Sequence, residues 1–187
     1  LGSPHSARKA GILRVFQAPQ VIGELTCLEN VTLSSASLTA TGLVASTIGR
    51  PWMLRRERER WDKAARALAE VGLSDHLQAP ASGLTYGQRR LLDLARAING
   101  DPRVLLLDEP SAGLNDSETA EFSAILERLD RSAMCVVLVE HKVDVIDRLC
   151  ERIVVLELGS VIAAGPPAEV WRDERVANAY LGVAGNA

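Results

Sequence analysis

Two short, wholly apolar runs with a helical segment between them constrain the fold of this chain most strongly. The runs are Val104 to Leu107 and Met134 to Val139. Continuous apolar runs of this length are typical of strands buried on both faces of a parallel sheet. Residues from about Ser117 to Asp130 carry apolar side chains at helical spacing. This strand–helix–strand order predicts an α/β fold with right-handed parallel crossovers.

Two more helices are predicted upstream of the first run. From about Leu54 to Val71 the pattern is helical, with an apolar stripe made by Trp61, Ala65, Leu68 and Ala69. Another helix begins after Tyr86-Gly87 and is stopped by Asn99-Gly100-Asp101-Pro102. The stretch from Ser34 to Ile48 is rich in Ser, Thr and Ala and fits either a loop or a loosely specified helix.

A β-hairpin is predicted towards the C-terminus. Arg152 to Leu158 and Val161 to Ala164 are strand-like runs joined at Gly159-Ser160. The hairpin adds an antiparallel part to an otherwise parallel arrangement.

Composition narrows the class of protein. The 187 residues are 47% apolar and 24% charged, which is the balance of a globular protein. A net charge of −3 argues against a nucleic-acid-binding surface, and the run Arg55 to Arg60, which alternates in sign, is predicted to be a solvated helix face. The apolar runs are too short to span a bilayer and no secretory signal is present, so we expect a cytosolic location.

Four short motifs follow one another along the chain. They are Phe16-Gln17, Leu84 to Gln88, Val104 to Pro110, and Glu140-His141. Each motif alone is weak, but their order and spacing together indicate an ATP-hydrolysing domain.

Asp108-Glu109 closes a predicted strand, so both carboxylates emerge where an open α/β sheet places its ligands. One carboxylate there can hold Mg²⁺, generally through water, while its neighbour orients or deprotonates an attacking water. Alternatively, the acidic pair simply caps the strand and opens a turn before Pro110. Gln17 could supply a neutral amide to the same metal or water.

Gly87 lies at the start of a predicted helix, where backbone N–H groups and the helix dipole favour a phosphate. Thr85 adds a hydroxyl donor, although an ordinary N-cap and turn would explain the same residues. His141 directly follows a predicted strand, so its ring can reach the sheet edge of Glu109. A histidine there without such context is more often a structural hydrogen-bonding residue.

Together these motifs resemble the ATP-binding cassette domain of membrane transporters. Arg14 to Gln20 resembles the Q-loop, and Leu84 to Arg90 resembles the family signature, with Tyr86 in place of the usual first glycine. Val104 to Pro110 resembles Walker B, and Ser111 to Asn115 resembles the D-loop, with Asn115 where many members have aspartate. His141 matches the switch histidine.

The signature with tyrosine, the Gly113-Leu114-Asn115 sequence and the ending Val176 to Gly182 are similar to one subgroup. That subgroup is the branched-chain amino acid importer ATPases, specifically the larger, LivG-like subunit. The resemblance implies a P-loop NTPase-like α/β fold: a mostly parallel sheet flanked by helices, a helical signature subdomain and a C-terminal β-hairpin. It divides the chain into a Q-loop segment (1–33), a helical subdomain (34–100), a Walker B to H-loop core (101–165) and a C-terminal tail (166–187).

The family resemblance also implies the roles of the residues. Glu109, His141 and Gln17 are expected to be catalytic, and Asp108 and Gln17 to serve Mg²⁺. The signature residues are expected to contact the ATP of a partner protomer, with Asn115 in the D-loop beside them; they are Thr85, Tyr86, Gly87 and Gln88.

The expected partners follow from the same resemblance. They are a second ATPase subunit, identical or different, the transmembrane permease subunits, and indirectly a periplasmic or extracellular binding protein, with no nucleic acid. The segment from Gln17 to about Ser82 would dock on the membrane subunit at the cytoplasmic face of the cell membrane.

The 187 residues contain no Gly-x-x-x-x-Gly-Lys-Ser/Thr loop. The family places that loop upstream of the Q-loop, so we expect the N-terminal third of the domain to be missing and this polypeptide alone to be inactive. Three hypotheses stay open. The chain is a partial sequence of an importer ATPase, or a truncated non-catalytic partner that donates its signature to an intact protomer, or a non-transport ATPase of the superfamily.

Overall fold

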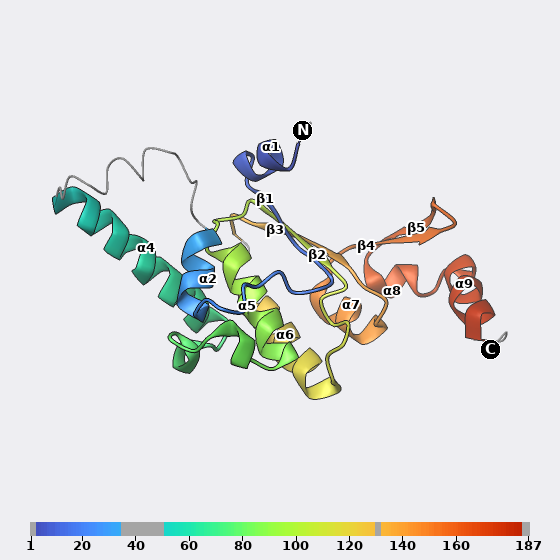
Figure 1. Ribbon diagram of the computed structural model, residues 1–187. Helices are drawn as coiled ribbons and strands as arrows, with labels where there is room; N and C mark the ends of the chain where they lie inside the picture. The colour runs from blue at the N-terminus through green and yellow to red at the C-terminus, as the bar shows by residue number, and fades with distance from the viewer. Residues whose placement is uncertain (1–2, 35–50, 130–131, 185–187) are drawn as a thin grey trace. The chain divides into compact units, whose positions relative to one another are not determined.

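The computed structural model describes residues 3–34, 51–129 and 132–184 (Figure 1). These residues form two compact units, Leu1–Val139 and Glu140–Ala187, and each is described by itself. Apart from Ser34, the stretch predicted as a loop or loose helix lies outside the described residues. The four-segment division predicted from the sequence stays a prediction.

The first unit is built on a parallel sheet of three strands in the order β1-β2-β3. The strands are β1 (Ile12–Val15), β2 (Val104–Asp108) and β3 (Cys135–Val139). Leu105 of β2 is paired with Leu13 on one side and with Val136 on the other. The parallel α/β fold predicted from the two apolar runs is therefore confirmed, and it brings the carboxyl ends of β1 and β2 together.

The expected burial of the strands on both faces is wrong for β3. Leu105 and Leu107 of β2 are buried, but Val137 and Val139 of β3 are 45% and 57% exposed. Side chains alternate between the faces of a sheet, and the described part of the first unit leaves one face uncovered at these two valines. The apolar run indicated the strand correctly, whereas its burial depends on what covers it.

The described part of the first unit also contains five α-helices and two short turns of 3-10 helix. They are α1 (Pro4–Lys9), α2 (Cys27–Ser34), α4 (Pro51–Glu70), the 3-10 turns η1 (Ser74–His76) and η2 (Ala81–Gly83), α5 (Tyr86–Ile98) and α6 (Asp116–Arg128). Helix α5 contacts β1, α2 and α4, so it is the central helix of this unit (Figure 1). The three helices predicted from the sequence are confirmed within a few residues, as α4, α5 and α6.

The apolar stripe of α4 differs from the expected one. Ala64, Ala67 and Leu68 are buried, whereas Ala69 is exposed. The buried positions are spaced three and four residues apart, and Ala69 falls off that face.

Helix α2 begins with a capping box that fixes the chain after the Q-loop segment. The Glu29 carboxylate Oε2 accepts hydrogen bonds from the Thr26 backbone N–H at 2.8 Å and from its hydroxyl at 2.9 Å. These hydrogen bonds, the backbone one first, lower the pKa of Glu29. The start of α2 is thereby stabilised.

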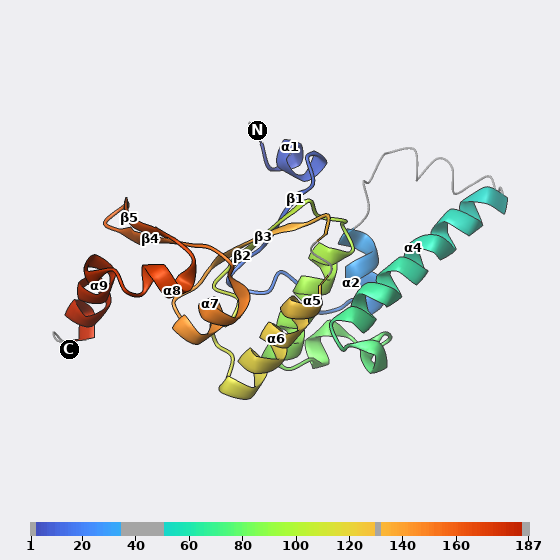
Figure 2. The same ribbon diagram turned by 180° about the vertical axis from the view of Figure 1, so that it is seen from behind.

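The second unit contains α7 (Val143–Leu149), β4 (Ile153–Glu157), β5 (Ser160–Gly165), α8 (Pro167–Val170) and α9 (Glu174–Ala184). Strands β4 and β5 form the predicted antiparallel hairpin, and α8 and α9 lie against β5 (Figure 2). The turn is one residue earlier than expected, at Leu158-Gly159, whose φ angles of 47° and 81° suit a tight hairpin turn. No helix among the described residues has the length and apolar content needed to cross a membrane.

Candidate functional site

The candidate site lies at the carboxyl ends of β1 and β2. Gln17 follows β1 and Glu109 follows β2, and their side chains meet: the Gln17 amide Nε2 donates a hydrogen bond of 3.1 Å to the Glu109 carboxylate Oε2. The two residues are 92 positions apart in the chain. The parallel pairing of the strands therefore brings together the amide and the carboxylate that the sequence singled out.

Glu109 has an unusual backbone conformation. Its φ angle is 44°, in the left-handed region that non-glycine residues rarely adopt. Its backbone N–H donates to the carbonyl of Val139 at the end of β3, at 2.9 Å. Residues held in this region cluster at functional sites, since the surrounding structure must maintain the strain.

Asp108 forms an ion pair with Arg14, a residue that the sequence analysis did not single out. The Arg14 Nη2 lies 2.5 Å from Asp108 Oδ2, and its guanidinium carbon lies 4.8 Å from the centre of the Phe16 ring. Arg14 is paired in register with Leu106 on the neighbouring strand, two residues before Asp108. An exposed arginine in a four-residue strand is the sequence signal that could have indicated this contact.

The residues present at this edge fit a hard divalent cation. Asp108, Glu109 and Gln17 carry oxygen ligands, which Mg²⁺ prefers, and the Gln17 amide nitrogen is directed at Glu109, which leaves its carbonyl oxygen for a cation. Among the described residues there is no cluster of three or more His, Cys, Asp or Glu side chains that could enclose a metal by itself. This arrangement suits Mg²⁺, which commonly keeps waters and takes one or two carboxylates together with substrate phosphates.

The signature residues begin helix α5. The Thr85 hydroxyl accepts a hydrogen bond from the Gln88 backbone N–H at 3.2 Å, and the Gln88 side-chain oxygen accepts one from the Thr85 N–H at 3.0 Å. This is a capping box, so the N-cap expected as an alternative is present. The Thr85 oxygen accepts in this contact, and its hydroxyl hydrogen can still be donated to a phosphate.

Gly87 and Gly113 have tight surroundings that a larger residue would disturb. A Cβ atom at Gly87 would lie 2.7 Å from Glu118 Oε1, and one at Gly113 would lie 3.0 Å from Tyr86 Cε1. Glu118 belongs to a second capping box, in which Asn115 is the N-cap of α6. The signature and the D-loop of one chain therefore contact each other, beside a cavity of about 230 Å³ lined by Thr85, Gln88, Leu114, Phe122 and other residues.

His76 is a further residue that sequence reasoning missed. Its Nε2 lies 3.3 Å from the Gln88 Nε2, although the sequence analysis gave it no role. His76 lies in the turn η1 between α4 and α5, so only the tertiary fold places it beside the signature. No local pattern in the sequence indicates this contact.

His141 belongs to the second unit. It is exposed and follows β3 by two residues. Its grouping with Glu109 stays a prediction from the sequence.

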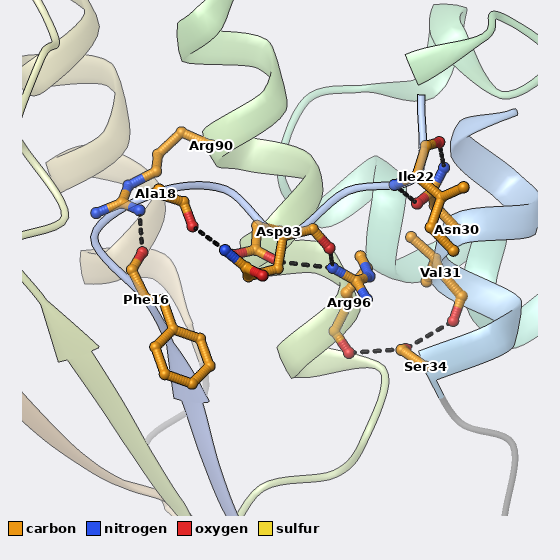
Figure 3. A network of polar contacts seen from close by, with 10 residues as sticks. Phe16, Ala18, Ile22, Asn30, Val31, Ser34, Arg90, Asp93 and Arg96 are labelled. Carbon is orange, nitrogen blue, oxygen red and sulfur yellow. Dashed lines mark hydrogen bonds and ion pairs between the residues drawn. The ribbon is translucent and has the colours of Figure 1, made fainter. Parts of the chain in front are cut away.

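Arg90 is a charged residue of the site that the sequence analysis did not single out, and its side chain is fully buried, at 0% exposed. Five main-chain carbonyl oxygens accept hydrogen bonds from its guanidinium: those of Phe16, Gln17, Asp108, Glu109 and Pro110. The bond to Phe16 is drawn in Figure 3. One feature of the sequence indicates this burial. Leu94 and Ala97, four and seven residues after Arg90, are apolar and lie on the same face of the helix.

Comparison with known proteins is consistent with this geometry. Residues 3–112 match the family model described as ABC transporter. Residues 160–186 match the model described as branched-chain amino acid ATP-binding cassette transporter. Among curated proteins, the branched-chain amino acid transport ATP-binding protein LivG of Salmonella typhimurium is 34% identical over 177 residues, which is 94% of this chain and 69% of LivG. BraF of Pseudomonas aeruginosa is 35% identical over 181 residues, covering 96% of this chain and 71% of BraF.

A solved structure shares the fold as well. The ADP conformation of an ATP-binding cassette of an ABC transporter superposes with a TM-score of 0.76 at 26% identity, covering 96% of this chain and 71% of that one. The family resemblance inferred from the four motifs is therefore confirmed, and the chain belongs to the ATP-binding cassette family of ABC transporters.

Proposed function

We propose that the chain is the ATP-hydrolysing subunit of an ABC importer for branched-chain or related amino acids. The observation that carries the proposal is the 3.1 Å contact between Gln17 and Glu109 at the carboxyl ends of neighbouring parallel strands. Similarity to LivG and BraF over nearly the whole chain supports the substrate class. The match of residues 160–186 supports it independently.

The residues at the strand ends have different roles in phosphoryl transfer. Glu109 orients or deprotonates the attacking water, and Gln17 positions that water through its amide. Asp108 would hold Mg²⁺, and the ion would supply positive charge that offsets the charge developing on the transferred phosphoryl group. His141, as the family resemblance implies, would contact the γ-phosphate.

The signature acts on a second protomer. Thr85 to Gln88 present the N-terminus of α5 to the ATP held by the partner, since backbone N–H groups and the helix dipole favour a phosphate there. Asn115 lies in the D-loop at the same interface. The two ATPase subunits close head to tail at the cytoplasmic face of the membrane, and the closure drives the permease subunits between their two states.

Loss of the gene in its host tests the proposed transport. We expect uptake of labelled leucine, isoleucine and valine to fall, and to return with the wild-type gene but not with the Glu109→Gln variant. A panel containing polar amino acids and urea controls for related importers. Unchanged branched-chain uptake, with loss of another substrate, would show that the substrate class is wrong.

A polypeptide limited to these 187 residues is proposed not to hydrolyse ATP. These residues contain the signature, Walker B and Q-loop residues but no Gly-x-x-x-x-Gly-Lys-Ser/Thr loop, whose backbone and lysine supply much of the charge stabilisation in this chemistry. We expect its phosphate release to equal that of the same polypeptide carrying Glu109→Gln. Turnover above that control contradicts this part of the proposal.

A further inference from the structure

Arg90 has none of the roles assigned above, although it is fully buried at the centre of the site. Removing a guanidinium from water is unfavourable unless its N–H groups find hydrogen-bond acceptors. The five carbonyl acceptors match the five N–H groups of an arginine side chain. A lysine has only three N–H groups on a single atom and could not reach this set.

The acceptors come from the two segments that carry the candidate catalytic pair. Nη1 donates to the carbonyl of Gln17 at 2.8 Å, and Nη2 donates to the carbonyl of Glu109 at 2.8 Å. The side chains of these same two residues are hydrogen-bonded to each other. One guanidinium group therefore fixes both backbones from which the catalytic amide and carboxylate project.

The contact also maintains the unusual conformation of Glu109. Its φ angle of 44° is stable only where the surroundings determine it. Arg90 binds the carbonyls immediately before and after that angle, those of Asp108 and Glu109, and also the carbonyl of Pro110 at 3.0 Å. The direction of the Glu109 carboxylate thus depends on Arg90.

Arg90 lies on α5, the helix that begins with the signature. Arg96 on the same helix donates to the carbonyl of Gln20. It also donates to Asp93 Oδ1 at 2.9 Å (Figure 3). The segment from Phe16 to Gln20 is therefore connected to α5 at two points. A displacement of the signature helix would therefore be transmitted to Gln17 and Glu109 through these hydrogen bonds.

We infer that Arg90 is a positioning residue that couples the signature helix to the catalytic amide and carboxylate. The inference rests on the proposed function and deepens it. The signature serves the partner's ATP, whereas Gln17 and Glu109 serve the protomer's own, so Arg90 makes engagement at one ATP site set the geometry at the other.

The test is ATP hydrolysis by the full-length protein carrying Arg90→Lys, which keeps the charge and loses the fork of donors. We expect kcat to fall by about 10²-fold while KM for ATP changes by less than about threefold, because misplacement of a catalytic group by about 1 Å has an effect of this size. In the Glu109→Gln background the same substitution is expected to lower kcat by less than about threefold, because residues that act as a unit are not additive. Arg66→Lys makes the same chemical change at an exposed residue of α4. It is the matched control and should keep wild-type kcat.

Each outcome decides the matter. A kcat for Arg90→Lys close to that of the wild type, or losses from Arg90→Lys and Glu109→Gln that multiply, overturns the positioning role and leaves the proposed function intact. Absence of ATP hydrolysis by the wild-type protein overturns the proposed function, and the inference with it. Arg90→Gln is a second variant in case Arg90→Lys does not fold; if neither folds while Arg66→Lys does, Arg90 is a residue of the fold and the inference is wrong.

Discussion

Glu109→Gln in the full-length protein is expected to reduce ATP turnover by about 10²- to 10⁴-fold, the usual contribution of a general base. The substitution keeps the shape of the side chain, and the new amide oxygen can still accept the hydrogen bond from Gln17. The fold should therefore be unaffected, while the carboxylate that we propose orients or deprotonates the attacking water is lost. Phosphate release at saturating ATP measures the effect.

Glu70→Gln is the matched control, since it makes the same chemical change at an exposed residue at the end of α4. It should hydrolyse ATP at the wild-type rate. Thermal unfolding of both variants checks that neither loses structure. If Glu109→Gln retains more than about a tenth of wild-type turnover, which is less than a general base contributes, Glu109 is not the base.

Gly87→Ala is expected to destabilise the protein by about 1–3 kcal/mol, the usual effect of adding a methyl group to a filled space. The new Cβ would lie 2.7 Å from Oε1 and 3.0 Å from Cδ of Glu118, whose carboxylate is held in the capping box of α6. ATP hydrolysis should fall as well, because the methyl group also stands at the helix N-terminus that we propose meets the partner's phosphate. Denaturant unfolding and phosphate release measure the two effects separately.

A double-mutant cycle with Glu118→Ala separates these two causes. Removing the Glu118 side chain should lessen the loss of stability caused by Gly87→Ala, although loss of the cap itself costs about 1 kcal/mol. It should not restore ATP hydrolysis. Gly83→Ala is the control, since nothing lies within 4 Å of a Cβ atom there. Equal stability of Gly87→Ala and Gly83→Ala would contradict the packing argument.

The fold and part of the site could be predicted because they depend on local patterns. The apolar run of β2 and the helical spacing of α6 indicate a parallel crossover, and parallel strands place their carboxyl ends at one edge. Gln17 and Glu109 follow such strands, so their meeting is a consequence of topology. The capping box at Thr85 likewise depends on residues only three positions apart.

The contacts that complete the site could not be predicted, because they join elements far apart in the chain. Arg90 reaches carbonyls that lie 74 positions upstream and 20 positions downstream. Glu118 approaches Gly87 only because α6 packs near the start of α5. The exposure of Val137 and Val139 in β3 was missed for a similar reason, because the sequence of a strand does not show which other elements cover its two faces.

The left-handed backbone at Glu109 means that stability and the proposed catalytic role of this residue are in conflict. A non-glycine residue at positive φ costs about 1–2 kcal/mol, which glycine would largely avoid. A search for thermostable variants of this protein would therefore select glycine or asparagine at position 109 and lose the carboxylate. Engineering for stability should therefore leave Glu109 unchanged. A substitution at position 109 that stabilised the protein would show that the backbone is strained there.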